Sequence, residues 1–177
     1  MNKKNYRQFS TVVLFFWLLI TSCNNPSEEP AKGTSNSETI NEKTMKNQKL
    51  INFGKQYAAA WCSQKPDSVA AYFSSTGSLS VNANAPAIGR EAIAKVAQGF
   101  MTAFPDMIVS MDSLVTHPDA TSFHWTLTGT NTGPGGTGNK VKISGVERWQ
   151  FDGAGLIRES KGSFDAEEYN RQLGVKK

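Results

Sequence analysis

Residue types that commonly carry catalysis are few in this chain, and they are scattered. It contains two histidines, His117 and His124, and two cysteines, Cys23 and Cys62. Neither histidine lies near Cys62 in the sequence, and no His-Glu-x-x-His motif, Cys-x-x-Cys motif or carboxylate pair at the spacing of metal ligands is present. Because Cys62 follows Trp61 in an apolar stretch, we interpret it as a small core residue and not as a nucleophile. The sequence therefore predicts no metal site and no bound cofactor.

A glycine-rich segment, NTGPGGTGN at residues 131–139, follows a strand-like run and has the composition of a phosphate-binding loop. Such a loop must lead into the N-terminus of a helix, whose free amides face the anion. Here the next residues, KVKI at 140–143, alternate between polar and apolar side chains as another strand would. We therefore interpret the segment as the loop of a β-hairpin.

Three stretches in the first half of the chain have the pattern of helices. The first begins near Lys49, where large apolar residues recur on one helical face: Leu50, Phe53, Tyr57 and Trp61. The second covers residues 65–73, and the third covers residues 90–104 and ends before Pro105. These helices are amphipathic, so each needs another layer to cover its apolar face.

The second half of the chain supplies that layer, because it alternates with the period of β-strands. Strands are expected at residues 107–117, 120–130, 140–151 and 156–164, with a shorter one at 78–82. A last helix is expected over residues 165–173, with Asp165 as its N-cap. Helices grouped ahead of consecutive antiparallel strands predict an α+β domain in which a curved sheet wraps over the helices.

The N-terminus has the features of an export signal. Residues 1–22 combine a basic start with the apolar run TVVLFFWLLI, which is too short to span a bilayer. The next residues, Ile20-Thr21-Ser22-Cys23, resemble the lipidation motif of bacterial lipoproteins, which implies that Cys23 becomes the acylated N-terminus. This predicts an extracytoplasmic protein of the bacterial cell envelope that is anchored through lipid on Cys23, without saying in which membrane. A secreted protein cleaved elsewhere and an uncleaved anchor are the alternatives.

Removal of the signal changes the charge of the chain. The whole sequence has 19 basic and 15 acidic residues, but three of the bases precede Cys23, so 16 bases face 15 acids afterwards. No basic stripe remains, and a nucleic-acid partner is not expected. Residues 23–46 are rich in Asn, Ser, Glu, Lys and Pro, which predicts a flexible tether ahead of a domain at residues 47–177.

From about Tyr57 to Gly174 the chain resembles the SnoaL-like polyketide cyclase branch of the nuclear-transport-factor-2-like superfamily. Four segments in the same order carry the resemblance: AAAWCSQKPDSVAAYF, NAPAIGREAIAKVAQGFMTAFPD, WTLTGTNTG and FDGAGLIRESKGSFDAEEYNRQLG. The resemblance implies a cone-shaped fold, in which about three N-terminal helices pack on a curved, mixed and largely antiparallel sheet with an apolar pocket in its mouth. It also implies a short C-terminal helix.

The chain departs from the family's pattern on the last strand. In related cyclases an aspartate there moves a proton next to a carbonyl group, often with a histidine two residues before it. Alignment of this strand places Gly162 where the aspartate is expected and Ser160 where the histidine is expected. Glycine has no proton to transfer, so the family's usual route of ring closure is not expected here.

The positions expected to line the pocket are better preserved. Trp61 and Val96 match helix positions that touch substrate in the family, and other candidates share the faces of the same elements. The predicted lining residues are Trp61, Val96, Phe100, Phe104, Trp125 and Asn131. Core packing is the alternative for each of them.

Two functions remain open. The first is a binding module that holds a small lipophilic or aromatic molecule in the apolar pocket. The second is an isomerase, cyclase or hydrolase that uses another carboxylate, for which Glu147 and Glu159 are the candidates. A homodimer formed through the outer face of the sheet is a further possibility.

Overall fold

The computed structural model describes residues 34–175, with side chains from residue 39 onward. The predicted signal peptide, the lipidation motif and Cys23 lie outside the described residues. The elements, in chain order, are α1 (Thr34–Cys62), α2 (Pro66–Ala70), β1 (Phe73–Val81), β2 (Ala87–Ile88), α3 (Arg90–Ala103), β3 (Ile108–Thr116), β4 (Thr121–Thr130), β5 (Lys140–Phe151), β6 (Ile157–Phe164) and α4 (Ala166–Leu173).

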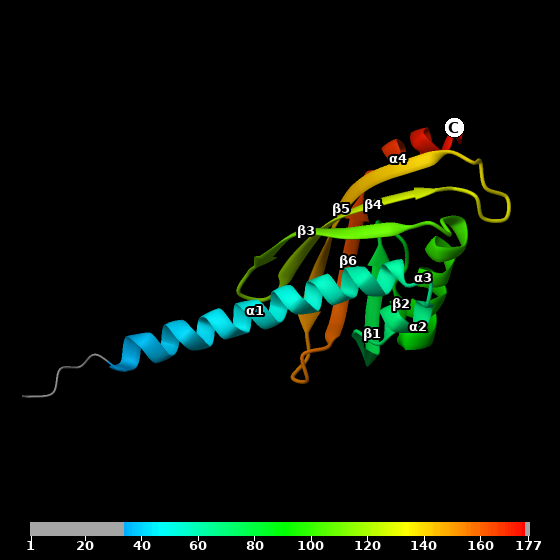
Figure 1. The fold of residues 1–177 in the computed structure, drawn as a ribbon. Coiled ribbons are helices and arrows are strands. Elements are labelled where there is room, and N and C mark those ends of the chain that lie inside the picture. Colours follow the sequence, from blue (N-terminus) through cyan, green and yellow to red (C-terminus); the bar gives the residue numbers. More distant parts are fainter. Residues whose placement is uncertain (1–33, 176–177) are drawn as a thin grey trace, which may run out of the picture.

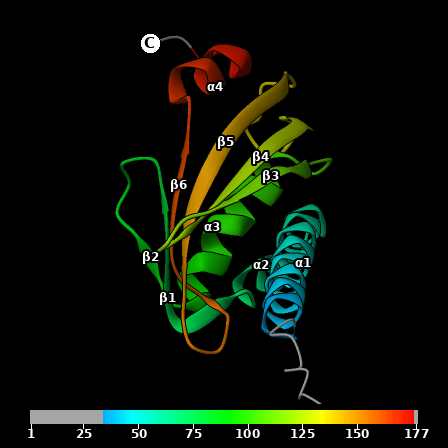
Figure 2. The same ribbon diagram turned by 90° about the vertical axis from the view of Figure 1, so that its left-hand side faces the viewer.

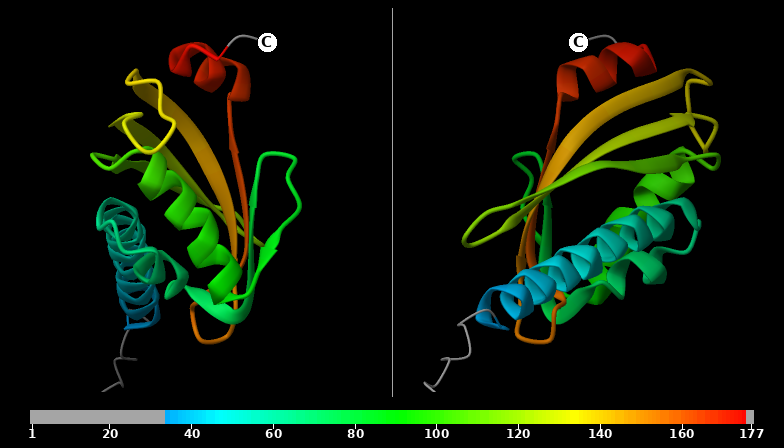
Figure 3. Two further views of the ribbon diagram at one scale, coloured as in Figure 1. Left: turned by 90° about the vertical axis from the view of Figure 1, so that its right-hand side faces the viewer. Right: turned by 60° about the vertical axis from the view of Figure 1, so that its left-hand side comes forward.

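The six strands form one curved sheet in the order β2-β1-β6-β5-β4-β3 (Figure 1). Neighbouring strands are antiparallel except for β1 and β6, which run parallel. Helices α1, α2 and α3 lie on one side of the sheet, and α4 sits at the end farthest from the start of α1 (Figures 2 and 3). The predicted α+β architecture, with helices against a mixed, largely antiparallel sheet and a short last helix, is confirmed.

The first helix is longer than predicted. Order was expected near Lys49, but α1 begins at Thr34, so residues 34–46 are helical where a flexible tether was predicted. Residues 39–49 of α1 are exposed, and this end of the helix extends beyond the sheet (Figure 1). The stretch from residue 34 to 49 has too few large apolar residues to pack on a core, but it contains no proline or glycine to stop a helix. The helix therefore continues outward from its packed end, which residue composition alone did not indicate.

The hydrophobic core lies between the helices and the inner face of the sheet. Tyr57 of α1 is fully buried there, with Trp149 of β5 at a ring-centroid distance of 5.1 Å. Trp149 in turn stacks on Phe123 of β4 at 4.6 Å. Buried aromatic pairs of this kind contribute about 0.5–1.5 kcal/mol beyond the burial of their surface. They fix α1 against the centre of the sheet.

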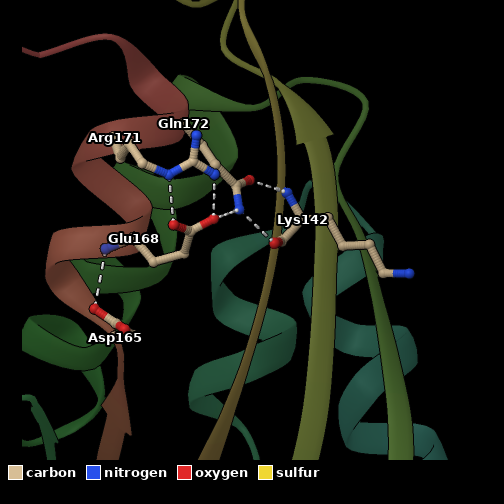
Figure 4. A network of polar contacts seen from close by, with 5 residues as sticks. All are labelled: Lys142, Asp165, Glu168, Arg171 and Gln172. Atoms are coloured by element: carbon tan, nitrogen blue, oxygen red, sulfur yellow. Dashed lines mark hydrogen bonds and ion pairs between the residues drawn. The ribbon is translucent and has the colours of Figure 1, made fainter.

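The final helix closes the sheet at one edge (Figure 4). Strand β6 ends opposite Gly145, so Lys142 on β5 has β4 on one side and no strand on the side of β6. The side-chain amide of Gln172 takes that place: its oxygen accepts from the Lys142 N–H at 2.6 Å, and its nitrogen donates to the Lys142 carbonyl at 2.9 Å. Edge backbone that would otherwise be free to pair with another chain is thus satisfied within the molecule.

Further contacts lie within α4 and its N-cap. Asp165 is its N-cap, as predicted, and accepts from the Glu168 N–H at 2.9 Å. The Glu168 carboxylate accepts from both Arg171 and Gln172 (Figure 4). These bonds hold the pKa of Glu168 down at about 2, with the bond from Arg171 as the largest cause. The bond from Gln172 to Glu168 restrains the side chain that also bonds the Lys142 backbone on β5.

The glycine-rich segment is a hairpin loop between β4 and β5, as predicted. Asn131 organises it: its amide nitrogen donates to the Ala103 carbonyl at 3.1 Å, and its oxygen accepts from the Thr137 N–H at 2.8 Å. No helix follows the glycines in this part of the described chain, so the amide cluster of a phosphate loop is not formed.

Candidate functional site

A small cavity lies between the inner face of the sheet and helices α1 and α3. Its volume is about 50 Å³, and five of its eleven lining residues are aromatic. The lining residues are Trp61, Leu79, Val81, Phe100, Val109, Phe123, Trp125, Leu127, Glu147, Gly162 and Phe164. They come from α1, α3 and every strand except β2. Glu147 is the one ionisable residue among them.

Two glycines on the inner face of the sheet make room for this cavity. Gly162 of β6 is the cross-strand partner of Glu147 on β5, and a Cβ atom at residue 162 would lie 3.4 Å from the Glu147 Cγ. Gly145 lies two residues before Glu147 on the same face, and the Trp125 ring covers it. A Cβ atom at residue 145 would overlap that ring and would approach the Ser163 carbonyl oxygen to 2.6 Å. Small residues at these positions therefore leave space for the Glu147 carboxyl and the Trp125 indole.

The Glu147 carboxyl group is buried and firmly held on one side. Its exposure is only 7%, and its Oε2 atom accepts three hydrogen bonds. The Ser160 hydroxyl donates at 2.7 Å, the Trp149 indole at 2.9 Å and the Tyr57 hydroxyl at 3.0 Å. All three bonds of the described side chains reach the same oxygen. None of these bonds reaches the other oxygen, Oε1, and Glu147 is one of the residues that line the cavity.

The surroundings shift the pKa of this carboxyl group. Burial raises the pKa of Glu147 above its ordinary value, while the bonds from Trp149, Ser160 and Tyr57 partly oppose that effect. Burial and the nearby carboxylate raise the pKa of the Tyr57 hydroxyl well above its ordinary value, so Tyr57 stays a hydrogen-bond donor. A carboxyl group with a raised pKa and one free oxygen can accept a hydrogen bond from a ligand or exchange a proton with it.

No cationic side chain neutralises Glu147. Within residues 39–175, the ion pairs join exposed or half-exposed groups on helices, strands and loops, and none includes Glu147. The same part of the chain holds no group of three or more His, Cys, Asp or Glu side chains that could bind a metal ion. Among the described residues, the Glu147 carboxyl group is therefore stabilised by neutral hydrogen-bond donors and has no charged partner.

The structure brings three of the six predicted lining residues together. Trp61 of α1, Phe100 of α3 and Trp125 of β4 line the cavity around Glu147. Trp61 and Phe100 meet edge to face, with ring centroids 6.0 Å apart. The Trp125 indole N–H is buried without a hydrogen-bond partner among the described residues.

The other three predicted lining residues lie elsewhere in the fold. Val96 packs at the margin of the core on α3, and Phe104 is fully buried at the end of that helix, 6.3 Å between ring centroids from Tyr169. Asn131 organises the hairpin loop. Phe104 and Asn131 were predicted because they share a face with lining residues of α3 and β4. Both lie just beyond the ends of these elements and do not line the cavity.

The two candidate carboxylates are on opposite faces of the sheet. Glu159 precedes Ser160 on β6, and its side chain pairs with Lys161 away from the cavity. Ser160 and Gly162 alternate onto the inner face, where Ser160 is fully buried. Of the two candidate carboxylates, Glu147 therefore lines the cavity and Glu159 does not.

The sequence did not reveal the groups that hold Glu147. Tyr57 was predicted as part of an apolar helix face, and Trp149 and Ser160 were not singled out as its partners. The sequence does indicate which residues share a face, because side chains two residues apart on a strand point to the same side. Glu147 and Trp149 share one face of β5, and Ser160 and Gly162 share one face of β6. The register between the two strands, which sets the contact, is a long-range property.

The model of the SnoaL-like polyketide cyclase family matches residues 52–173. The chain belongs to this family. The residues that line the cavity, from Trp61 to Phe164, all lie within the matched segment.

Solved structures support the same fold. A ketosteroid-isomerase-like protein from Catenulispora acidiphila, in complex with trimethylamine, is 17% identical with a TM-score of 0.63, over 70% of this chain and 93% of that one. AclR, a putative hydroxylase from Streptomyces galilaeus, is 21% identical with a TM-score of 0.62, over 73% and 98%. A putative SnoaL-like polyketide cyclase from Jannaschia is 18% identical with a TM-score of 0.59, over 86% and 100%. At these identities the likeness concerns the fold.

No curated protein matches the chain at a significant level. The site residues are therefore argued from the geometry alone.

Proposed function

We propose that the protein binds a small, largely apolar molecule in the cavity, with the free oxygen of Glu147 as its polar contact. The observation that carries this proposal is that all three described hydrogen bonds to the Glu147 carboxyl group reach one of its two oxygens. Three donors fix Oε2, and the carboxyl group faces a cavity whose other walls are apolar or aromatic. Binding sites for small molecules commonly combine an apolar lining with very few, well-placed polar groups.

The size of the cavity limits the ligand. A volume of about 50 Å³ is several times the ~10–15 Å³ that a single water molecule requires by the same measure. It suits a molecule of a few heavy atoms, or one part of a larger molecule. The complex of the Catenulispora relative with trimethylamine supports a ligand of this size in a protein of the same fold.

Proton transfer by Glu147 is the second candidate function. The raised pKa of the buried carboxyl group favours it, because acid–base groups work best when their pKa lies closer to neutral pH. The sequence resemblance places the acid of related cyclases at Gly162, and Glu147 is the cross-strand partner of that residue. A carboxyl group from the neighbouring strand would then serve an isomerase or cyclase reaction in the same cavity.

A panel of small neutral and charged aromatic and aliphatic compounds, screened by protein-detected NMR, tests the binding proposal. Compounds that bind should shift the indole resonances of Trp61 and Trp125. Trp61→Ala should abolish the shift of the Trp125 indole, and Glu159→Gln should leave the shifts of both indoles unchanged. Absence of any shift at these indoles across the panel would contradict the proposal. Turnover of a bound compound that stops in a folded Glu147→Gln variant would identify the second function.

We also propose that the domain is held in the cell envelope by lipid on Cys23. The support is the apolar run at residues 11–20 followed by Ile20-Thr21-Ser22-Cys23. In residues 34–175 no helix combines the length and apolarity needed to cross a bilayer. Cys23→Ala should move the protein from the membrane fraction to the soluble fraction, and unchanged fractionation would refute lipid anchoring at this residue.

A further inference from the structure

We propose that the ligand of the cavity is an organic amine bound in its protonated, ammonium form. This inference rests on the proposed binding function and names the chemical class of the ligand. It follows from two properties of the cavity wall: an unpaired carboxylate and a surrounding set of aromatic rings.

The first property is uncompensated negative charge. Glu147 is 7% exposed, and no Lys, Arg or His side chain lines the cavity. Buried charges in proteins are normally paired with an opposite charge or a metal ion. Three hydrogen bonds to Oε2 favour the ionised form of this carboxyl group and oppose the effect of burial, which favours the protonated form. A cation bound beside Glu147 would supply the opposite charge that the cavity wall lacks.

The second property is the aromatic lining. Five rings border the space beside the carboxylate: Trp61, Phe100, Phe123, Trp125 and Phe164. Aromatic rings attract organic cations, and proteins use groups of them to bind alkylated ammonium ions. Alkyl groups on the nitrogen would also contact the apolar walls, here Leu79, Val81, Val109 and Leu127. An alkylammonium ion thus complements both the charge and the surface of the cavity.

Other ligand classes fit less well. An anion would meet the carboxylate with no basic group to offset the repulsion. A metal ion would find a single carboxylate and no further ligand in the cavity wall. A neutral apolar molecule would fill the space but would leave Glu147 charged and unpaired, or force it to take up a proton.

The test uses two compounds of nearly the same shape, choline and 3,3-dimethylbutan-1-ol, in which a neutral carbon replaces the charged nitrogen. Affinities are measured by NMR titration of the complete mature protein, and circular dichroism confirms the fold of each variant. The wild-type protein should bind choline about tenfold or more tightly than the alcohol. Glu147→Gln should bring the two affinities close to parity. Glu159→Gln, which changes a carboxylate on the opposite face of the sheet, should retain the preference.

A second variant keeps the test decisive if Glu147→Gln fails to fold. Phe100→Leu removes one ring from the cavity wall and keeps an apolar side chain of similar length. It should weaken choline binding about threefold or more and change the affinity for the alcohol much less.

The possible outcomes separate this inference from the binding proposal. Equal or stronger binding of the alcohol to the wild-type protein overturns the amine inference and leaves the binding proposal intact. Failure of choline to bind while neutral aromatic compounds bind has the same meaning. If neither these two compounds nor the neutral and charged panel bind, both proposals fail.

Discussion

Glu147 and Gly162 face each other across β5 and β6, and the missing side chain of Gly162 leaves the space beside the Glu147 carboxyl group. A Cβ atom at residue 162 would lie 3.4 Å from the Glu147 Cγ and 3.2 Å from the Ser80 carbonyl oxygen. The resemblance to related cyclases implies a carboxylate on β6 at this point. In this chain the carboxylate that reaches the cavity is supplied by β5.

Gly162→Asp should therefore destabilise the protein, by about 2 kcal/mol or more. The new carboxyl group would compete with Glu147 for one buried site, and its Cβ atom would crowd Ser80. Urea unfolding measures the cost. Gly162→Ala should cost less, because it adds the crowding without the charge.

The electrostatic part can be isolated by repeating Gly162→Asp in a Glu147→Gln background. There the substitution should cost less than in the wild-type protein, since the two carboxyl groups no longer oppose each other. An equal cost in both backgrounds would show that the two positions do not interact.

Stability should depend on pH through Glu147. Burial raises the pKa of Glu147 in the folded state, so the carboxyl group binds its proton more tightly in the folded than in the unfolded protein. Its contribution to stability is therefore fully present below the unfolded value of 4.5 and is lost as the pH rises through the higher folded pKa. Tyr57, the titratable group that contacts Glu147, remains neutral in this range because its own pKa is raised.

The measurement is the difference in unfolding free energy between the wild-type protein and Glu147→Gln at a series of pH values. Glutamine does not titrate and its oxygen can still accept from Tyr57, Trp149 and Ser160. The wild-type protein should lose stability relative to the variant as the pH increases from 4 upward. A constant difference would contradict the raised pKa. Other carboxylates, such as Glu168, are common to both proteins and cancel.

Gly145→Ala should cost about 2–3 kcal/mol, because its Cβ atom would overlap the Trp125 ring and crowd the Ser163 carbonyl oxygen. Gly99→Ala on α3 is the matched control. A Cβ atom there meets nothing within 4 Å, so the helix should gain about 0.5–1 kcal/mol. Thermal unfolding of the two variants should move in opposite directions, and similar shifts would argue against the close packing of Trp125 on β5.

Gln172→Ala should free the edge of β5. The variant loses both hydrogen bonds to the Lys142 backbone, at a cost of about 1–2 kcal/mol, and the Lys142 amide should exchange its hydrogen faster. Arg171→Ala removes an exposed ion pair on the same helix and should change the stability much less than Gln172→Ala does. Unchanged exchange at Lys142 in Gln172→Ala would show that α4 does not protect this edge.

The sequence was a good guide to the elements that repeat a local pattern. The period-two runs of β3 to β6, the amphipathic packed end of α1, the Asp165 cap and the hairpin loop all follow from neighbouring residues. The start of α1 was missed because its residues offer no apolar face to bury, while the absence of proline and glycine lets the helix continue outward from its packed end. The short strand β2 has two residues and depends on its pairing with β1.

The site was only partly visible in the sequence, for a physical reason. Trp61, Phe100 and Trp125 were found because they share apolar faces with core residues. The choice between Glu147 and Glu159 depended on which face of each strand turns inward, and the support of Glu147 by Tyr57 spans 90 residues. Contacts of this kind arise from the register of β5 with β6 and the docking of α1, which no local pattern specifies.

The central claim is that the Glu147 carboxyl group is the functional group of a ligand-binding cavity. Carbon-13 NMR of the protein labelled at glutamate carboxyl carbons tests it most directly, with the Glu147 signal assigned from its absence in Glu147→Gln. We predict that this signal titrates above the ordinary glutamate range and shifts when a small compound fills the cavity. Titration in the ordinary range, with no response to any compound that binds the protein, would contradict the account.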